Sequence, residues 1–258
     1  MLADTIIVTF LPQGGASALY YADRLYQLPL GVIGVAAGTV LLPEMSRLIA
    51  AGDPDAAHRQ QNRSLVLSWL LALPFFVGFM TVSETIVAAI FQRGAFSAAA
   101  TLETTGVLAA YAFGLPAIVA IRSIVASFHA RGDTKTPLHA SLSAIALNLG
   151  FKLVLWKPFG ASGLALATAI GAIANFTILY VLAVRQKKTA PDGDFALRIV
   201  LIVIATIWLA AVLLVIERVL PGLPVIARLG VEIGVGLIMY GGVVWGGFRF
   251  FRLPLSLR

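Results

Sequence analysis

Apolar residues along this chain fall into long runs separated by short polar breaks. Seven runs approach or exceed the roughly 20 residues that an α-helix needs to cross the ~30 Å hydrocarbon core of a bilayer. They lie at Ala18–Leu42, Leu65–Phe91, Gly106–Phe128, Leu138–Trp156, Ala161–Val184, Ala196–Ile216 and Val225–Phe248. No strand-like alternation of apolar and polar residues competes with this pattern. The pattern predicts an all-α, polytopic membrane bundle with seven full transmembrane helices.

The breaks between the runs consist of residues that end helices. They are Ala51-Gly52-Asp53-Pro54, Arg131-Gly132-Asp133, Pro158-Phe159-Gly160, Pro191-Asp192-Gly193 and Pro221-Gly222. An eighth apolar piece, Met1–Leu11, is too short to span, since at about 1.5 Å per residue it covers about half a bilayer. We expect it to be the end of a truncated first helix whose beginning is missing.

Composition supports a membrane protein and excludes several kinds of catalytic site. Of the 258 residues, 59% are hydrophobic and only 12% are charged, whereas a soluble domain is about 25% charged. Without cysteine there is no disulfide scaffold, thiolate zinc site or cysteine nucleophile, and the three histidines are not at metal-ligand spacing. No nucleophile elbow, phosphate-binding glycine loop or paired carboxylate site is present. We therefore expect no enzymatic activity and no cofactor.

The positive residues predict the orientation of the bundle. A net charge of +7 would indicate a nucleic-acid partner in a soluble protein, but here the basic residues collect in loops, where topology explains them. One set of alternating loops and the C-terminal tail hold twelve: Arg47, Arg59, Arg63, Arg131, Lys135, Arg185, Lys187, Lys188, Arg198, Arg249, Arg252 and Arg258. The opposite set holds four: Arg93, Lys157, Arg218 and Arg228. The bias places the first set and the C-terminus in the cytoplasm.

Arg24 is the most informative charged residue inside a run. It follows Tyr20, Tyr21 and Asp23 near the predicted outer end of the first full span. One interpretation is an interfacial arginine that reaches toward the membrane surface beside the tyrosines. The other is a cationic ligand for a phosphate-like anion, which a guanidinium fork matches well. Asp23 does not neutralise Arg24 by default, because adjacent helix residues point to different faces.

Asn148, Lys152 and Thr168 form a second polar group. Asn148 and Lys152 are four residues apart and share a helix face. Asn148 and Thr168 are equally far from the turn at Pro158, so in an antiparallel pair they lie at similar depth. With a carboxylate such as Asp4, their oxygens could hold a small hard cation, or they could simply form hydrogen bonds between helices.

Arg122 also lies in the middle of a run. We expect it to face a polar interior, where it could contact an anion or a carboxylate; Glu84 could pair with it or lie near the outer interface. The small residues Gly163, Ala167 and Gly171 permit close approach of neighbouring helices.

Several motifs, in order along the chain, carry a resemblance to a known family. They are Tyr20–Leu25, Leu28–Val32, Leu41–Pro43, Ser46–Arg47, Phe91–Phe96, Ala130–Pro137 and Gly163–Thr168. Together they resemble the C-terminal lobe of the lipid II flippase family MurJ, also called MviN. The resemblance covers nearly the whole chain.

The resemblance implies a fold, a function and a location. The family fold has fourteen spans, within the multidrug/oligosaccharidyl-lipid/polysaccharide exporter (MATE-like) superfamily. This chain would correspond to its C-terminal half, with residues 1–188 as the transporter lobe and 189–258 as a C-terminal helix pair. The implied function is translocation of the undecaprenyl-pyrophosphate-linked peptidoglycan precursor across the bacterial inner membrane, by alternating access. The implied partners are that precursor, membrane lipids and the missing N-terminal lobe.

The resemblance also assigns residues. Arg24 matches a cavity arginine of the family. Asp4, Asn148, Thr168 and the Leu164 carbonyl match a sodium site that some members have, but Lys152 stands where an acidic ligand is expected. An ammonium there would repel sodium, so Lys152 is expected to pair with Asp4 instead. The alternatives are another exporter of the same superfamily, or a truncated fragment that does not transport.

Overall fold

The structure is a computed structural model that describes residues 9, 14–191, 193–251 and 253, with the backbone alone at 34–40. The described part contains helices and no strands. The helices are α2 (Gly15–Ala50), α3 (Pro54–Thr81), α4 (Ser83–Phe91), α5 (Ala98–Ala112), α6 (Leu115–His129), α7 (Lys135–Arg185), α8 (Gly193–Val219) and α9 (Val225–Phe250). The predicted all-α class is confirmed, whereas Asp4 lies outside the described residues.

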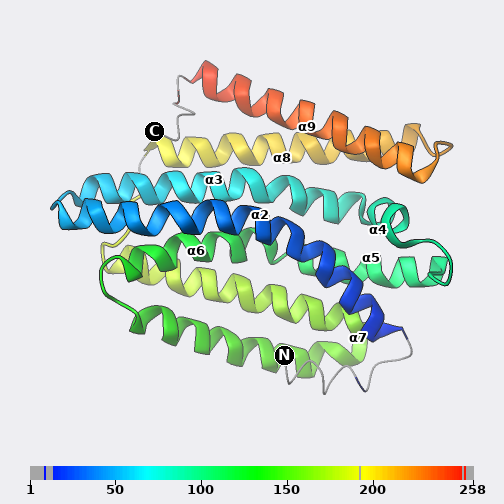
Figure 1. Cartoon of the computed structure of the whole chain (residues 1–258), viewed down its shortest axis with the longest axis horizontal. Coiled ribbons are helices and arrows are strands. Elements are labelled where there is room, and N and C mark those ends of the chain that lie inside the picture. Colours follow the sequence, from blue (N-terminus) through cyan, green and yellow to red (C-terminus); the bar gives the residue numbers. More distant parts are fainter. Residues whose placement is uncertain (1–8, 10–13, 192, 252, 254–258) are drawn as a thin grey trace.

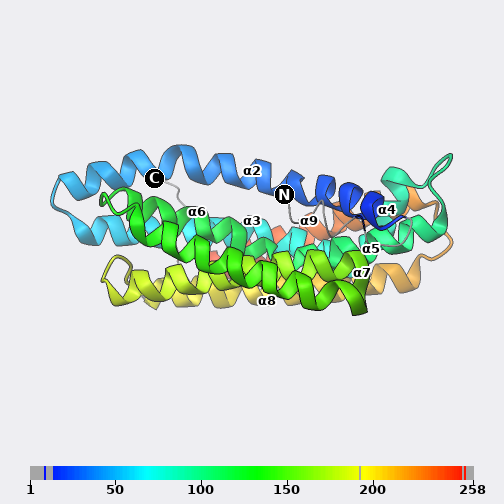
Figure 2. The same ribbon diagram turned by 90° about the horizontal axis from the view of Figure 1, so that it is seen from below.

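The helices run side by side along the long axis of the molecule (Figure 1). α8 and α9 form one edge of the bundle, α7 forms the opposite edge, and α2 and α3 lie between them. Seen from the perpendicular direction, α2 lies on one face and α8 on the other (Figure 2). Five described helical segments are long and apolar enough to cross a membrane, namely α3, α5 together with α6, α7, α8 and α9.

α7 is a hairpin of two antiparallel arms. The backbone reverses at Gly160, whose φ of 55° and ψ of −131° lie outside the helical region. The register across the arms is set by a hydrogen bond from Asn148 Nδ2 to the Ala167 carbonyl oxygen, at 3.3 Å. A Cβ at Gly171 would lie only 2.9 Å from that of Asn148. The reversal near Pro158–Gly160, the similar depth of Asn148 and the Thr168 region, and the close approach at Gly171 were all predicted.

Two predicted spans are interrupted. The run predicted at Leu65–Phe91 begins at Pro54 in the structure and is broken at Val82, where α3 gives way to α4. The run predicted at Gly106–Phe128 begins at Ala98 and is broken at Phe113–Gly114, between α5 and α6. Pro116 lacks the N–H that a continuous helix needs.

The neighbours of the α5–α6 break fix its geometry. A Cβ at Gly114 would lie 2.8 Å from the Ala169 Cα, so the second arm of α7 passes directly against the break. The Trp69 indole N–H donates to the Pro116 carbonyl oxygen at 3.1 Å. A helix interruption inside a bilayer needs such side-chain partners in place of the missing backbone hydrogen bonds, because hydrocarbon satisfies no backbone polar group.

The core consists of closely packed apolar side chains, while many large apolar side chains remain on the outer surface. Tyr240 of α9 reaches across to α3, where its hydroxyl donates to the Leu70 carbonyl oxygen at 2.9 Å. On α8 and α9, Ile207, Leu237 and Ile238 are each at least 65% exposed. Such a surface suits contact with lipid, where packing and hydrogen bonds rather than water exclusion hold helices together.

Candidate functional site

One face of α2 carries Arg24 and is open. The Arg24 side chain is exposed, with Nη2 3.3 Å from the Tyr20 hydroxyl and the guanidinium carbon 4.9 Å from the centre of the Tyr20 ring. Asp23 accepts a hydrogen bond from Gln27, and no ion pair joins Asp23 to Arg24 among the residues that the structure describes. A guanidinium held beside an aromatic ring, with no carboxylate partner in the described part of the chain, retains donors for an anion. Its role as an anion ligand remains a prediction.

The opposite face of α2 is anchored in the core. Ala22 is fully buried, and Tyr26 stacks on Tyr111 of α5 with ring centres 5.1 Å apart and planes 19° from parallel. These contacts fix the rotation of α2 about its axis. They therefore determine which way the Arg24 face points.

Arg122 lies apart from its candidate partner. Both Arg122 and Glu84 are exposed, and no ion pair joins them among the residues that the structure describes. The neighbouring Ser123 faces the other way, into the bundle, where its hydroxyl lies 2.7 Å from that of Ser64. Of the two placements left open for Glu84, pairing with Arg122 is therefore not formed among the described residues. An anion-binding role of Arg122 remains a prediction.

The polar group on the α7 hairpin is assembled, with the Asn148 amide nitrogen and the Thr168 hydroxyl hydrogen-bonded to backbone carbonyl oxygens. Asn148 donates to the Ala167 carbonyl, and the Thr168 hydroxyl donates to the Leu164 carbonyl oxygen at 3.0 Å. Lys152, one turn from Asn148, is only 5% exposed. The lysine side chain is therefore buried and does not extend to the surface.

A polar network joins the predicted cytoplasmic ends of α3, α6, α7 and α8. Lys188, after α7, forms an ion pair with Asp133 in the α6–α7 turn, and its ammonium lies 4.4 Å from the centre of the Phe128 ring. Thr136 donates to Asp133 through its backbone N–H at 3.0 Å and its hydroxyl at 2.9 Å. The hydrogen bond from Lys188, aided by those from Thr136, lowers the pKa of Asp133 to about 2.

α3 completes this network. Asn62 donates to the Ala190 carbonyl oxygen at 2.9 Å, and the His58 ring lies 3.2 Å from the Lys187 carbonyl oxygen. Sequence reasoning identified the Ala130–Pro137 motif without identifying this contact. The only local signal was Asp133 followed three residues later by Thr136, whose backbone N–H and hydroxyl donate to it, and that spacing does not indicate Lys188 or α3.

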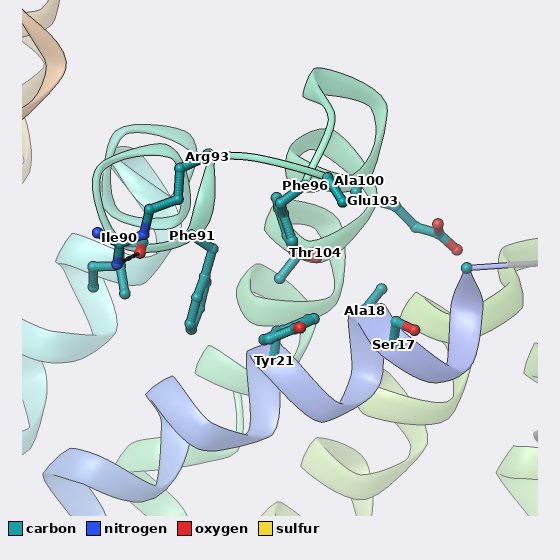
Figure 3. A pocket seen from close by; sticks show the side chains of 12 residues that line it. Ser17, Ala18, Tyr21, Ile90, Phe91, Arg93, Phe96, Ala100, Glu103 and Thr104 are labelled. Carbon is teal, nitrogen blue, oxygen red and sulfur yellow. Dashed lines mark hydrogen bonds between the residues drawn. The ribbon is translucent and has the colours of Figure 1, made fainter.

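A cavity of about 480 Å³ lies at the opposite end of the bundle, where α2 begins (Figure 3). Its floor is aromatic: Tyr21 contacts Phe91 and Phe96 with ring centres 4.8 and 5.2 Å apart. Arg93 and Glu103 line it, and in Figure 3 they point to opposite sides of that floor. Sequence reasoning missed this cavity, because its lining comes from three separate segments.

Comparison with known proteins identifies the family. The family model described as lipid II flippase MurJ matches residues 1–229. A probable lipid II flippase MurJ of Rhizobium meliloti is 39% identical over 203 residues, 79% of this chain and 38% of that protein. One from Rickettsia prowazekii is 38% identical over 176 residues, 68% of this chain and 35% of that protein.

A solved structure agrees. The lipid II flippase MurJ in its inward closed conformation superposes with a TM-score of 0.80 at 28% identity, over 97% of this chain and 50% of that one. This chain spans about two fifths of the curated relatives and half of that structure. By sequence and by fold, the chain belongs to the lipid II flippase MurJ family.

Proposed function

We propose that this chain is the C-terminal lobe of a lipid II flippase of the bacterial inner membrane. The observation that carries the proposal is the superposition of nearly the whole chain on half of a MurJ structure. The two arms of α7, with the α5–α6 pair and the remaining helices, give seven full spans after the segment at residues 1–11. Residues 1–188 form the transporter lobe, and 189–258 form the terminal helix pair with a cytoplasmic C-terminus.

Within this proposal the substrate binds without covalent chemistry. Arg24 lies about 14 Å along α2 from its start at Gly15, on a face that no described carboxylate neutralises. Its fork of donors suits a pyrophosphate, which accepts paired hydrogen bonds. The apolar surfaces of α8 and α9 would lie against the lipid tail. Alternating access by this lobe and an N-terminal lobe would carry the precursor to the periplasmic leaflet.

We further propose that the α7 group binds no sodium. The Thr168 hydroxyl and the Asn148 amide are engaged with backbone carbonyls, and Lys152 brings a positive charge to the face that carries Asn148. A positive charge on that face opposes a bound cation. Pairing of Lys152 with Asp4 is the arrangement that the charges favour.

The test is complementation in a bacterium depleted of its own flippase. This lobe would be co-expressed with the N-terminal half of the Rhizobium meliloti relative, and growth would be measured. We expect growth with the unmodified lobe, none with Arg24→Ala and poor growth with Arg24→Lys, since a point charge lacks the guanidinium fork.

Arg249→Ala is the matched control, because Arg249 lies 5.2 Å from the Trp245 ring centre much as Arg24 lies against Tyr20. We expect it to grow normally. Normal growth with Arg24→Ala, at equal expression, would reduce Arg24 to an interfacial residue. Failure of the unmodified pair to grow, with both halves present in the membrane, would contradict the proposed function.

A further inference from the structure

The cavity at the start of α2 lies on the same face of that helix as Arg24. Ser17 lines the cavity, and Arg24 follows Ser17 by seven residues. Seven residues turn an α-helix through about 700°, close to two full turns, so the two side chains point within about 20° of the same direction. Both side chains are exposed. The rise over seven residues is about 10 Å. A molecule bound at Arg24 can therefore extend along one open face into the cavity.

Two opposite charges line the cavity without neutralising each other. Neither Arg93 nor Glu103 takes part in an ion pair among the described residues. Arg93 is held in place by a 2.6 Å hydrogen bond from Nη2 to the Ile90 carbonyl oxygen. Glu103 lies beside the first turn of α2, where its Oε2 is 2.9 Å from the position of a Cβ on Gly14. Figure 3 shows the two side chains pointing away from each other.

A buried hydroxyl adds a specific polar contact. Thr104 lines the cavity and is 1% exposed, and its Oγ1 has no hydrogen-bond partner in the described part of the chain. A buried hydroxyl without a partner is unfavourable, so a ligand that supplies an amide or carbonyl group there is favoured. The floor of Tyr21, Phe91 and Phe96 is rigid and apolar, which suits aliphatic side chains.

Together these features select the class of ligand. The volume of about 480 Å³ would accommodate on the order of 16 water molecules, at about 30 Å³ each. A neutral sugar would leave both charges unmatched. A zwitterionic lipid headgroup carries both charges, but on neighbouring atoms, whereas Arg93 and Glu103 lie on opposite sides of the floor. An extended peptide that bears a carboxylate and a separate amine matches the cavity.

We propose that this cavity binds the peptide portion of the lipid-linked precursor, with a carboxylate at Arg93, an amine at Glu103 and a backbone amide at Thr104. The proposal rests on the proposed function, since it places the pyrophosphate at Arg24 and the peptide toward the predicted outer end. Arg93 and Glu103 are then determinants of specificity for the charges on the peptide.

The test measures binding of three soluble peptides to the purified full chain in detergent, by titration calorimetry. N-acetyl-Lys-Ala-Ala carries an amine and a carboxylate; its norleucine analogue lacks the amine, and its C-terminal amide lacks the carboxylate. We expect the first to bind and each of the others to bind about tenfold more weakly. Arg93→Gln should abolish the difference caused by amidation, and Glu103→Gln the difference caused by norleucine.

Arg218→Gln is the control for net charge and should leave all three affinities unchanged, while thermal unfolding verifies that every variant is folded. Absence of binding at millimolar peptide, equal binding of the three peptides, or equal competition by glycerophosphoethanolamine would overturn the proposal. Because calorimetry requires no transport, its result is independent of complementation. Growth in the complementation test without peptide binding in calorimetry would reject the peptide site alone. Peptide binding without growth would reject the assignment as a flippase lobe alone.

Discussion

The ion pair between Asp133 and Lys188 should contribute measurably to stability. Its disruption is examined with Asp133→Asn, Lys188→Met and the double variant. The fall in the pKa of Asp133 from 3.8 to about 2 corresponds to at most about 2.4 kcal/mol, at 1.36 kcal/mol per unit. The carboxylate side chain is 23% exposed, so solvent screens part of this. We expect each single variant to lose about 1–2 kcal/mol of unfolding free energy.

The double variant separates the pair from its surroundings. Lys188→Met also removes the contact with the Phe128 ring, worth about 0.5–1 kcal/mol, whereas Asp133→Asn keeps an oxygen for Thr136. If the ion pair is the shared element, the double variant should lose about 1 kcal/mol less than the sum of the single variants. The assay is unfolding of the purified protein in detergent, at low and high salt. Strict additivity would refute the reasoning.

The pH dependence gives an independent measure. The pKa of Asp133 is lower in the folded protein than in the unfolded chain, so the stabilisation is complete above pH 3.8 and disappears as the pH falls toward 2. The difference in midpoint temperature between the unmodified protein and Asp133→Asn should be constant from pH 6 to 8. It should close between pH 4 and 2. A difference that is undiminished at pH 2 would show that the charge of Asp133 is not its cause.

Three further predictions concern packing, ions and topology. Gly171→Ala should destabilise the protein by about 1–3 kcal/mol, since the added Cβ would lie 2.9 Å from the Asn148 Cβ on the facing arm. Gly150→Ala is the control, because a Cβ there would have no neighbour within 4 Å, and it should cause no such loss in thermal unfolding. Lys152→Asp should make the protein more stable as sodium replaces potassium in a thermal-unfolding titration. In the unmodified protein the Lys152 ammonium, about 4 Å from a bound sodium ion, would oppose binding by roughly 4 kcal/mol at an effective dielectric of 20, which lowers the affinity by about three orders of magnitude. Stabilisation of the unmodified protein by sodium would contradict this. A cysteine at Phe159 should react with an impermeant thiol reagent on intact cells and one at Ala51 should not; the reverse pattern would invert the topology.

Hydropathy predicted the membrane-buried part of the fold and missed its boundaries. The runs identify residues that must avoid water, so the helices and the reversal at Gly160 were predictable. α3 begins eleven residues earlier than its apolar run because its start is set by a cap, with Asp53 accepting from the Ala56 N–H at 2.8 Å. The breaks at Val82 and Gly114 lie inside apolar sequence. They depend on tertiary contacts, such as that between Gly114 and Ala169, which no local pattern encodes.

The polar residues were predictable where geometry along one helix or hairpin fixes them. Asn148 was placed beside the second arm of α7 from its distance to the turn alone. The Asp133–Lys188 pair and the cavity lined by Arg93 and Glu103 each require segments that are brought together only by folding. For the Asp133–Lys188 pair that separation is 55 residues, which single-sequence spacing arguments do not reach.

The abrupt reversal of α7 has a consequence for the synthesis of the protein. Because the chain turns at a single residue, Gly160, its two arms are joined by almost no hydrophilic loop. The turn lies on the predicted outer side, with one charged side chain beside it, Lys157, and Pro158–Gly160 itself is apolar or backbone alone. Taking one lysine through the centre of a bilayer costs about 2.5–3.5 kcal/mol on insertion scales. We therefore expect the two arms of α7 to enter the membrane together as a helical hairpin.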